Sequence, residues 1–226
     1  MTTTLRTYGD GCAIARGLDL VGERWALLVI RELLLGPKRY TDLRSGLPNA
    51  SPNVLSQRLA ELESAGVIRR RKLPPPAGSR VYELTDWGRG LETTLTSLGH
   101  WAARSPSGLP LDAPVGADSI ILALRSRFDP GAAPGLHARY ELALGEDHFR
   151  IEIADAEIEV AHGRAAQADA TIDTDPNTLA SVLWGGQPLR AAQRSGKMTI
   201  DGDKTAVERF LRLFPMPRPT TATSMA

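Results

Sequence analysis

The chain has 226 residues, of which 42% are hydrophobic, so it is large enough for two modest globular domains. Its net charge of +1 is unevenly distributed, because residues 1–105 carry 15 basic and 10 acidic side chains while residues 106–226 carry 12 and 16. The single cysteine excludes an internal disulfide. A basic half joined to an acidic half indicates that one domain meets a polyanion, and two unequally charged solvated surfaces are the simpler alternative.

The first half is predicted to form helices with a β-hairpin before the last of them. Apolar segments predict five helices, over residues 14–21, 23–35, 40–47, 52–65 and about 85–103. The fourth helix begins with Ser51 as N-cap and Pro52 at its first position, and Gly66 ends it. Two strands, over residues 67–73 and 80–84, flank a proline-rich turn.

The second half is predicted to mix strands and helices, which makes the whole chain α+β. Apolar–polar alternation predicts strands over residues 119–128, 138–144, 149–160, 170–174 and 198–200. Helix start signals at Asp175 and Asp203, together with apolar spacing, predict helices over residues 176–184, 189–194 and 204–214.

Proline, serine and glycine separate the two halves and indicate a linker. The predicted organisation is a first domain over residues 1–104, a linker over 105–114, a second domain over 115–214 and a disordered tail over 215–226.

Two short helices joined by a tight turn, followed by a basic hairpin, are the layout of a winged helix-turn-helix. In the second helix of the pair, Leu55, Leu59 and Leu62 fall within roughly 60° of one another at about 100° per residue and form a core stripe. The opposite face, with Asn53 and Gln57, is small and rich in amides. Such a face suits the major groove of DNA, where Asn and Gln pair with adenine.

The hairpin adds consecutive positive charges, and strand geometry leaves about two of them on each face. We expect them to contact phosphates, and the alternative is a solvated hairpin whose arginines pair with Glu63 or Glu83. The predicted DNA contacts are Lys38, Arg39, Thr41, Ser51, Asn53, Ser56, Gln57, Arg58, Arg69, Arg70, Arg71, Lys72 and Arg80.

Several segments of the first half resemble bacterial HxlR-type regulators. They are Cys12–Arg16, Gly22–Leu28, Arg31–Tyr40, Leu43, Ser51–Leu59, Leu62–Val67 and Tyr82–Thr85. The resemblance covers about residues 12–101 and implies a homodimeric winged-helix regulator with a MarR-like architecture. The family usually has a basic residue where Asn53 stands, so the resemblance leaves the identity of the base contacts open.

The resemblance also implies that the first and last helices of this domain build the dimer interface. The last helix carries an apolar stripe at helical spacing, and its predicted interface residues are Leu91, Leu95, Leu98 and Trp101. The alternative is that the stripe is core for its own subunit. Some members of the family sense oxidants through a cysteine at the position of Cys12. Here no second cysteine exists, so we favour a small residue that docks the first helix.

The segments Ala168–Thr174 and Ser195–Asp203 resemble sterol-carrier-protein type 2-like domains, over roughly residues 115–214. The resemblance implies an α/β sandwich with an apolar cavity between sheet and helices. The predicted ligand-binding residues are Phe149, Leu179, Leu183, Trp184, Leu189, Phe210, Leu213 and Phe214. Because apolar stripes on helices are usually core, core and cavity are equally weighted interpretations of these residues.

Enzyme motifs are missing from the sequence, which contains no Gly-x-Ser-x-Gly, Walker loop or dinucleotide fingerprint. The four histidines show no metal-ligand spacing, so we expect no catalytic residues, no cofactor and no metal. No apolar run reaches the length of a membrane span and the polar N-terminus lacks a secretory signal, which predicts a cytoplasmic protein.

The sequence therefore predicts a homodimeric regulator on a pseudo-palindromic DNA operator, modulated by an apolar small molecule. The alternative is a lipid-binding or carrier protein whose winged helix serves only for dimerisation.

Overall fold

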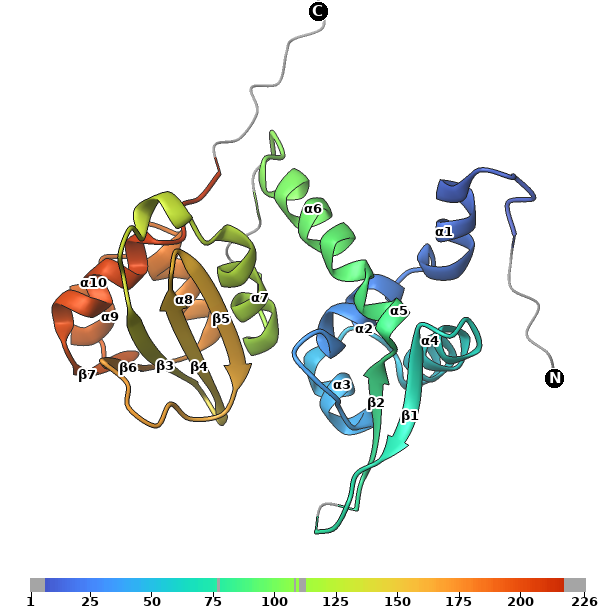
Figure 1. Cartoon of the computed structure of the whole chain (residues 1–226), viewed down its shortest axis with the longest axis horizontal. Coiled ribbons are helices and arrows are strands. Elements are labelled where there is room, and N and C mark those ends of the chain that lie inside the picture. The colour runs from blue at the N-terminus through green and yellow to red at the C-terminus, as the bar shows by residue number, and fades with distance from the viewer. Residues whose placement is uncertain (1–6, 77, 108, 110–112, 218–226) are drawn as a thin grey trace, which may run out of the picture. The chain divides into compact units, whose positions relative to one another are not determined.

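The computed structural model describes residues 7–76, 78–107, 109 and 113–217 and divides into two compact units, with the boundary between Thr96 and Ser97 (Figure 1). Much of the predicted linker and most of the predicted tail lie outside the described residues. No helix in the described ranges is long and apolar enough to cross a membrane.

The first unit contains the predicted helices and hairpin. The elements are α1 (Ala13–Val21), α2 (Ala26–Leu33), α3 (Tyr40–Gly46), α4 (Pro52–Ser64), β1 (Ile68–Lys72), β2 (Arg80–Leu84), α5 (Asp86–Arg89) and the start of α6 (Leu91–Ala103). The core forms where the apolar faces of α2, α3 and α4 meet β1 and β2, and it buries Ile30, Leu43 and Leu59 completely. Burial of this apolar area is the main stabilising contribution to the unit.

The predicted single helix over residues 85–103 is wrong, because the chain forms a short α5 and a separate α6. Thr85 caps α5 by accepting a hydrogen bond from the Gly88 backbone N–H at 3.0 Å. A Cβ on Gly88 would lie 2.0 Å from the Val67 carbonyl oxygen, so this turn packs directly on the backbone that begins the hairpin. Two glycines, Gly88 and Gly90, weaken the helix and allow the break.

The hairpin is joined to the helices at its base. β1 and β2 are antiparallel, with Arg70 opposite Tyr82 and Lys72 opposite Arg80. Tyr82 also exchanges two backbone hydrogen bonds with Lys38, of 3.0 and 2.8 Å, in the segment between α2 and α3. The Lys38 ammonium in turn lies 2.8 Å from the buried carboxylate of Glu32. These contacts fix the direction of the hairpin relative to α3 and α4.

The second unit is built on a five-stranded sheet in the order β5-β4-β3-β6-β7. Its strands are β3 (Ala138–Leu144), β4 (Asp147–Ala154), β5 (Glu157–His162), β6 (Ala170–Thr174) and β7 (Met198–Gly202). Only β3 and β6 pair in parallel, and the remaining neighbours are antiparallel. The helices are α7 (Ala117–Arg127), α8 (Pro176–Leu183), α9 (Leu189–Arg194) and α10 (Lys204–Arg212), with a 3₁₀ turn, η1, at Pro130–Ala132.

Two predicted strands of this unit are wrong. Residues 119–128 belong to α7, where Ile120, Ile121 and Leu124 are buried at helical spacing. Residues 149–160 form two strands, because the chain turns at Asp155 and Ala156 with φ of 52° and 59°. Asp is a usual residue at such a position, but Ala is not, and without a glycine after the aspartate the sequence carried only a weak turn signal there.

Candidate nucleic-acid interface

Helix α4 presents the amide-rich face that the sequence predicts. Ser51 caps the helix by accepting a hydrogen bond from the Val54 backbone N–H at 3.4 Å. Leu55 and Leu59 are completely buried, whereas Asn53 and Gln57 are exposed. The helix therefore offers a polar, uncluttered surface on the side opposite its core stripe.

Tyr40 connects α3 to the start of α4, a role that the sequence reasoning missed. Its hydroxyl donates to the Pro52 carbonyl oxygen at 3.2 Å and accepts from the Ser56 hydroxyl at 3.4 Å. Ser56 is thus both an exposed residue of the predicted DNA face and part of a helix–helix contact. In the sequence, Tyr40 lies at helical spacing from Leu43 and Leu47, a pattern that indicates packing and gives no sign of a polar contact.

Arg58 lies next to Leu62 at the edge of the leucine stripe of α4 and is buried with it. It is only 7% exposed, and its guanidinium pairs with Glu61 one turn along the helix and lies 3.8 Å from Glu23. The sequence analysis included Arg58 among the DNA contacts, and its burial corrects that placement. We leave Arg58 out of the proposed DNA contacts.

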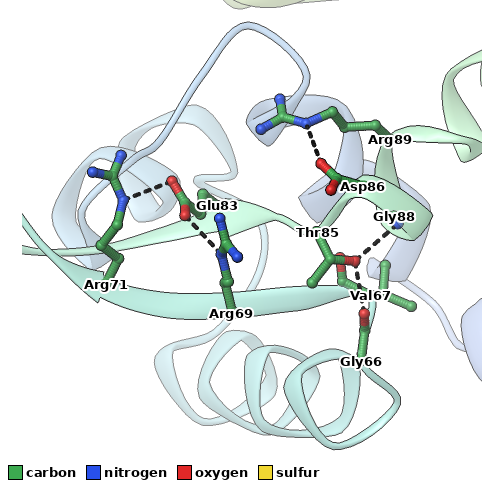
Figure 2. Close-up of polar contacts among 9 residues, drawn as sticks. All are labelled: Gly66, Val67, Arg69, Arg71, Glu83, Thr85, Asp86, Gly88 and Arg89. Atoms are coloured by element: carbon green, nitrogen blue, oxygen red, sulfur yellow. Dashed lines mark hydrogen bonds and ion pairs between the residues drawn. The ribbon is translucent and has the colours of Figure 1, made fainter.

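The hairpin arginines form the intramolecular pairs that the sequence offered as the alternative. Figure 2 shows Glu83 between Arg69 and Arg71, each of which donates to it at 2.8 Å. Arg70 points from the other face, pairs with Glu63 at 2.9 Å and lies over the Tyr82 ring. All three arginines remain exposed although Glu83 is buried, and a guanidinium has five N–H donors, of which a pair with one carboxylate uses only a part. The pairs therefore do not prevent the same side chains from contacting phosphates.

Glu83 is the buried carboxylate at the centre of the hairpin. Burial alone would raise the pKa of Glu83, but hydrogen bonds and positive charge from Arg69 and Arg71 outweigh it and hold the pKa below its ordinary value. Glu83 therefore neutralises part of the charge of these two arginines.

The remaining predicted contacts occupy two other places. Lys72 and Arg80 are exposed and directly opposite each other at the far end of the hairpin. Arg39 is exposed just before α3, and the Thr41 hydroxyl donates to Asp42 at 3.2 Å. Lys38 is half-buried in its pair with Glu32, so its charge is already engaged.

The predicted interface residues on α6 divide into two pairs. Leu91 and Leu95 are half-buried and pack against the core of the first unit. Leu98 and Trp101 are 43% and 75% exposed. The apolar stripe of α6 therefore packs into the core of its own subunit at the start of the helix, and two of its side chains stay exposed at the end of the helix.

The predicted ligand-binding residues of the second unit are mostly packed into its core. Phe149, Leu179, Phe210, Leu213 and Phe214 are at most 1% exposed, and the ring centroids of Phe210 and Phe214 lie 4.9 Å apart. Leu183, Trp184 and Leu189 are half-buried, and the Trp184 indole N–H donates to the Phe214 carbonyl oxygen at 2.9 Å. A pocket of about 690 Å³ is lined instead by residues between His100 and Pro106. Among the described residues no group of three or more His, Cys, Asp or Glu side chains is placed to hold a metal ion.

Cys12 is exposed immediately before α1, so it does not dock the helix as a small core residue. Hydrogen bonds from the backbone N–H groups of Ala15 and Ile14 lower the pKa of the thiol. A thiolate at the start of a helix is stabilised by these unpaired donors and by the helix dipole.

We expect Cys12 to be alkylated by iodoacetamide at a lower pH in the folded protein than in the same protein unfolded in urea. The folded chain offers the donors of α1 to the thiolate, and the unfolded chain does not, so the midpoint of the pH–rate profile should move down on folding. Mass spectrometry of the Cys12 peptide measures both profiles. Coincident midpoints would contradict the effect of the helix.

Comparisons with known proteins agree with this geometry. Residues 20–107 match the family model described as HxlR-like helix-turn-helix, and residues 118–220 match the model described as alkyl sulfatase C-terminal. The second match does not test the predicted sterol-carrier type, which stays a prediction.

Two similar relatives come from Bacillus subtilis (strain 168). The uncharacterized HTH-type transcriptional regulator YvaP is 38% identical over 87 residues, which are 38% of this chain and 81% of YvaP. The HTH-type transcriptional regulator YodB is 35% identical over 84 residues, which are 37% of this chain and 75% of YodB.

Two solved structures are also similar to this chain. The reduced form of YodB is 31% identical, covers 42% of this chain and 94% of its own, and superposes with a TM-score of 0.38. The sec-alkylsulfatase Pisa1 from Pseudomonas sp. is 17% identical, covers 93% of this chain and 31% of its own, and has a TM-score of 0.46. Helix α4 has an exposed amide face, a basic hairpin lies beside it, and the chain matches two HTH-type regulators over most of their length. The chain therefore belongs to the HxlR-like helix-turn-helix family of transcriptional regulators.

Proposed function

We propose that this regulator binds DNA as a homodimer, with α4 in the major groove and the β1–β2 hairpin against phosphates. The observation that carries the proposal is the exposed Asn53 and Gln57 face above a fully buried leucine stripe, in a unit whose hairpin bears exposed arginines. Asn and Gln distinguish bases by hydrogen bonds, whereas Arg and Lys on the hairpin set affinity and register. The contacts proposed are those predicted from the sequence without Arg58 and without Lys38, whose ammonium is held by the buried Glu32 carboxylate.

Dimerisation is proposed through α1 and the end of α6. α1 carries Ile14, which is 74% exposed, and α6 carries Leu98 and Trp101. Large apolar side chains that stay exposed in a monomer are typical of surfaces that a partner covers. A two-fold dimer would hold two copies of α4 about 34 Å apart, which requires an operator made of two inverted half-sites.

The second unit is proposed to bind an apolar small molecule and to modulate DNA affinity, as sterol-carrier-like domains bind apolar ligands. Its net acidic charge does not suit DNA, and three of its predicted ligand-binding residues, Leu183, Trp184 and Leu189, are only half-buried. A ligand that prefers one dimer geometry would shift DNA affinity by its differential affinity for the two states, typically about 1–3 kcal/mol. The proposed place of action is the cytoplasm, where the DNA is.

Selection from random duplex DNA by the purified full chain tests the proposed function. We expect enrichment of an inverted repeat whose half-sites are centred about ten base pairs apart, or a multiple of that spacing. Replacing Gln57 by Ala should relax the base preference at one position of each half-site, with a loss of about 1–3 kcal/mol in discrimination.

The matched control is Gln193→Ala, on α9 of the second unit, which should leave the selected sequence unchanged. If the wild-type chain enriches no sequence, its winged helix does not read DNA. The lipid-carrier alternative, with the winged helix used only for dimerisation, would then take its place.

A further inference from the structure

The side-chain amide of Gln57 is held in one orientation by Glu61. The two residues are four apart on α4, and the Gln57 amide nitrogen donates to a Glu61 carboxylate oxygen at 2.9 Å. An ionised carboxylate can only accept hydrogen bonds, so the NH₂ group of Gln57, and not its carbonyl, must face Glu61. The two ends of this amide are therefore distinguished by chemistry.

Glu61 is itself fixed from the other side. The buried guanidinium of Arg58 donates to the second oxygen of Glu61, and Arg58 lies 3.8 Å from Glu23. The Glu61 side chain is only 14% exposed. Arg58, which cannot lose its proton, thus keeps Glu61 in place, and Glu61 keeps the Gln57 amide in place.

This arrangement leaves a defined set of groups on the exposed side of Gln57. One amide hydrogen is used by Glu61, so the carbonyl oxygen and the second amide hydrogen remain for a base edge. Adenine presents a donor and an acceptor in the major groove, at N6 and N7, and matches that set. Guanine presents two acceptors, at O6 and N7, and places one of them against the Gln57 carbonyl.

We infer that Arg58 and Glu61 are positioning residues that make Gln57 select adenine over guanine in each half-site. The inference rests on the proposed function, because it assumes that Gln57 meets a base. Neither positioning residue contacts DNA itself, and together they set the polarity of the amide that does.

Glu61→Gln tests the inference by reversing that polarity. Arg58 only donates, so the introduced carbonyl oxygen should turn to Arg58 and the introduced NH₂ group should turn to Gln57. The Gln57 carbonyl then accepts this hydrogen bond, and its own NH₂ group points outward with two donors, as guanine requires. The wild-type chain should bind the adenine operator about tenfold more tightly than the guanine-substituted one, and Glu61→Gln should invert this ratio.

The operator is the duplex selected from random DNA by wild type, and the position read by Gln57 is the one whose preference Gln57→Ala abolishes. Fluorescence anisotropy then gives the adenine-to-guanine affinity ratio at that position. The matched control is Glu63→Gln, which removes the same charge from the same helix but pairs with Arg70 on the hairpin. It should raise affinity for both duplexes and leave their ratio at the wild-type value.

The possible results of this experiment distinguish the inference from the proposed function. An inverted ratio for Glu61→Gln, with Glu63→Gln like wild type, supports the inference. A folded Glu61→Gln with the wild-type ratio overturns the inference and leaves the proposed function standing. A wild-type chain that selects no sequence overturns both.

A second measurement needs no variant and decides the matter if Glu61→Gln does not fold. In the free wild-type protein, the side-chain NH₂ hydrogens of Gln57 should exchange with water several-fold more slowly than those of Asn53. Asn53 lies on the same exposed face, and within the described ranges its side chain has no hydrogen bond. Equal exchange rates, measured by nuclear magnetic resonance, would show that Glu61 does not hold the Gln57 amide in one orientation and would overturn the inference.

Discussion

Replacing Leu98 and Trp101 together by Asp is expected to yield a folded monomer that binds operator DNA at least about a hundredfold more weakly. The two side chains are 43% and 75% exposed, so charges there should not disturb the subunit itself. A monomer engages one half-site at a time and loses the gain in effective concentration that linked sites provide, which is about 10²–10⁴-fold. Light scattering measures the assembly, and circular dichroism measures the fold.

The choice of these two residues follows from where α6 is buried. Leu95 packs against the core of its own subunit, so a charge there would unfold the unit and could not isolate dimerisation. Thr93→Asp with Thr94→Asp is the matched control, because both residues are exposed on the same helix and together gain the same charge. A double variant that remains dimeric would remove the end of α6 from the interface.

The first unit was largely predictable because its signals are local and agree with one another. Ser51, Pro52 and Gly66 specify both ends of α4, and the structure places them as cap, first residue and terminating turn. The break between α5 and α6 was not predictable from apolar spacing, which continues through it. It depends on the approach of Gly88 to the Val67 carbonyl, a contact between segments distant in sequence.

The second unit shows where periodicity is ambiguous. Ile120, Ile121 and Leu124 fit a helix, yet the same stretch also alternates well enough to suggest a strand. The turn at Asp155 and Ala156 has positive φ at both positions, and although Asp tolerates such a position, no glycine follows it to mark the turn between β4 and β5. The first error concerns the type of an element, which packing settles, and the second concerns a turn within a stretch whose strand type was predicted correctly.

Within the candidate interface, the sequence identified the exposed face but not the network beneath it. Spacing placed Asn53 and Gln57 outward, as the structure does. Spacing alone treated Arg58 as a polar residue and therefore as exposed, whereas an arginine can occupy a core position when carboxylates pair with it. The sequence also left open which arginines pair with Glu63 and which with Glu83. The strand register decides this, because it places Arg69 and Arg71 on the face of Glu83 and Arg70 on the other face.

The largest effect on general DNA affinity is expected from replacing Lys72 and Arg80 together by Ala. These side chains are directly opposite across the strands, and within the described residues neither takes part in an ion pair. Like charges opposite each other destabilise a hairpin unless an anion lies between them, and a DNA phosphate is such an anion. By contrast, removing Arg69 and Arg71 would leave the buried Glu83 carboxylate without its donors and would confound folding with binding.

We expect the Lys72→Ala, Arg80→Ala variant to bind operator and random DNA at least about tenfold more weakly. The slope of log affinity against log salt concentration should fall in magnitude by about 2, because each lost phosphate contact removes about 0.9. The melting temperature should stay the same or rise slightly, since a repulsive pair is gone. Arg190→Ala with Arg194→Ala is the matched control, which removes the same charge from exposed positions on α9. A variant with the wild-type salt slope would show that the end of the hairpin does not touch DNA, and the intramolecular pairs with Glu63 and Glu83 would then be the main role of the hairpin charges.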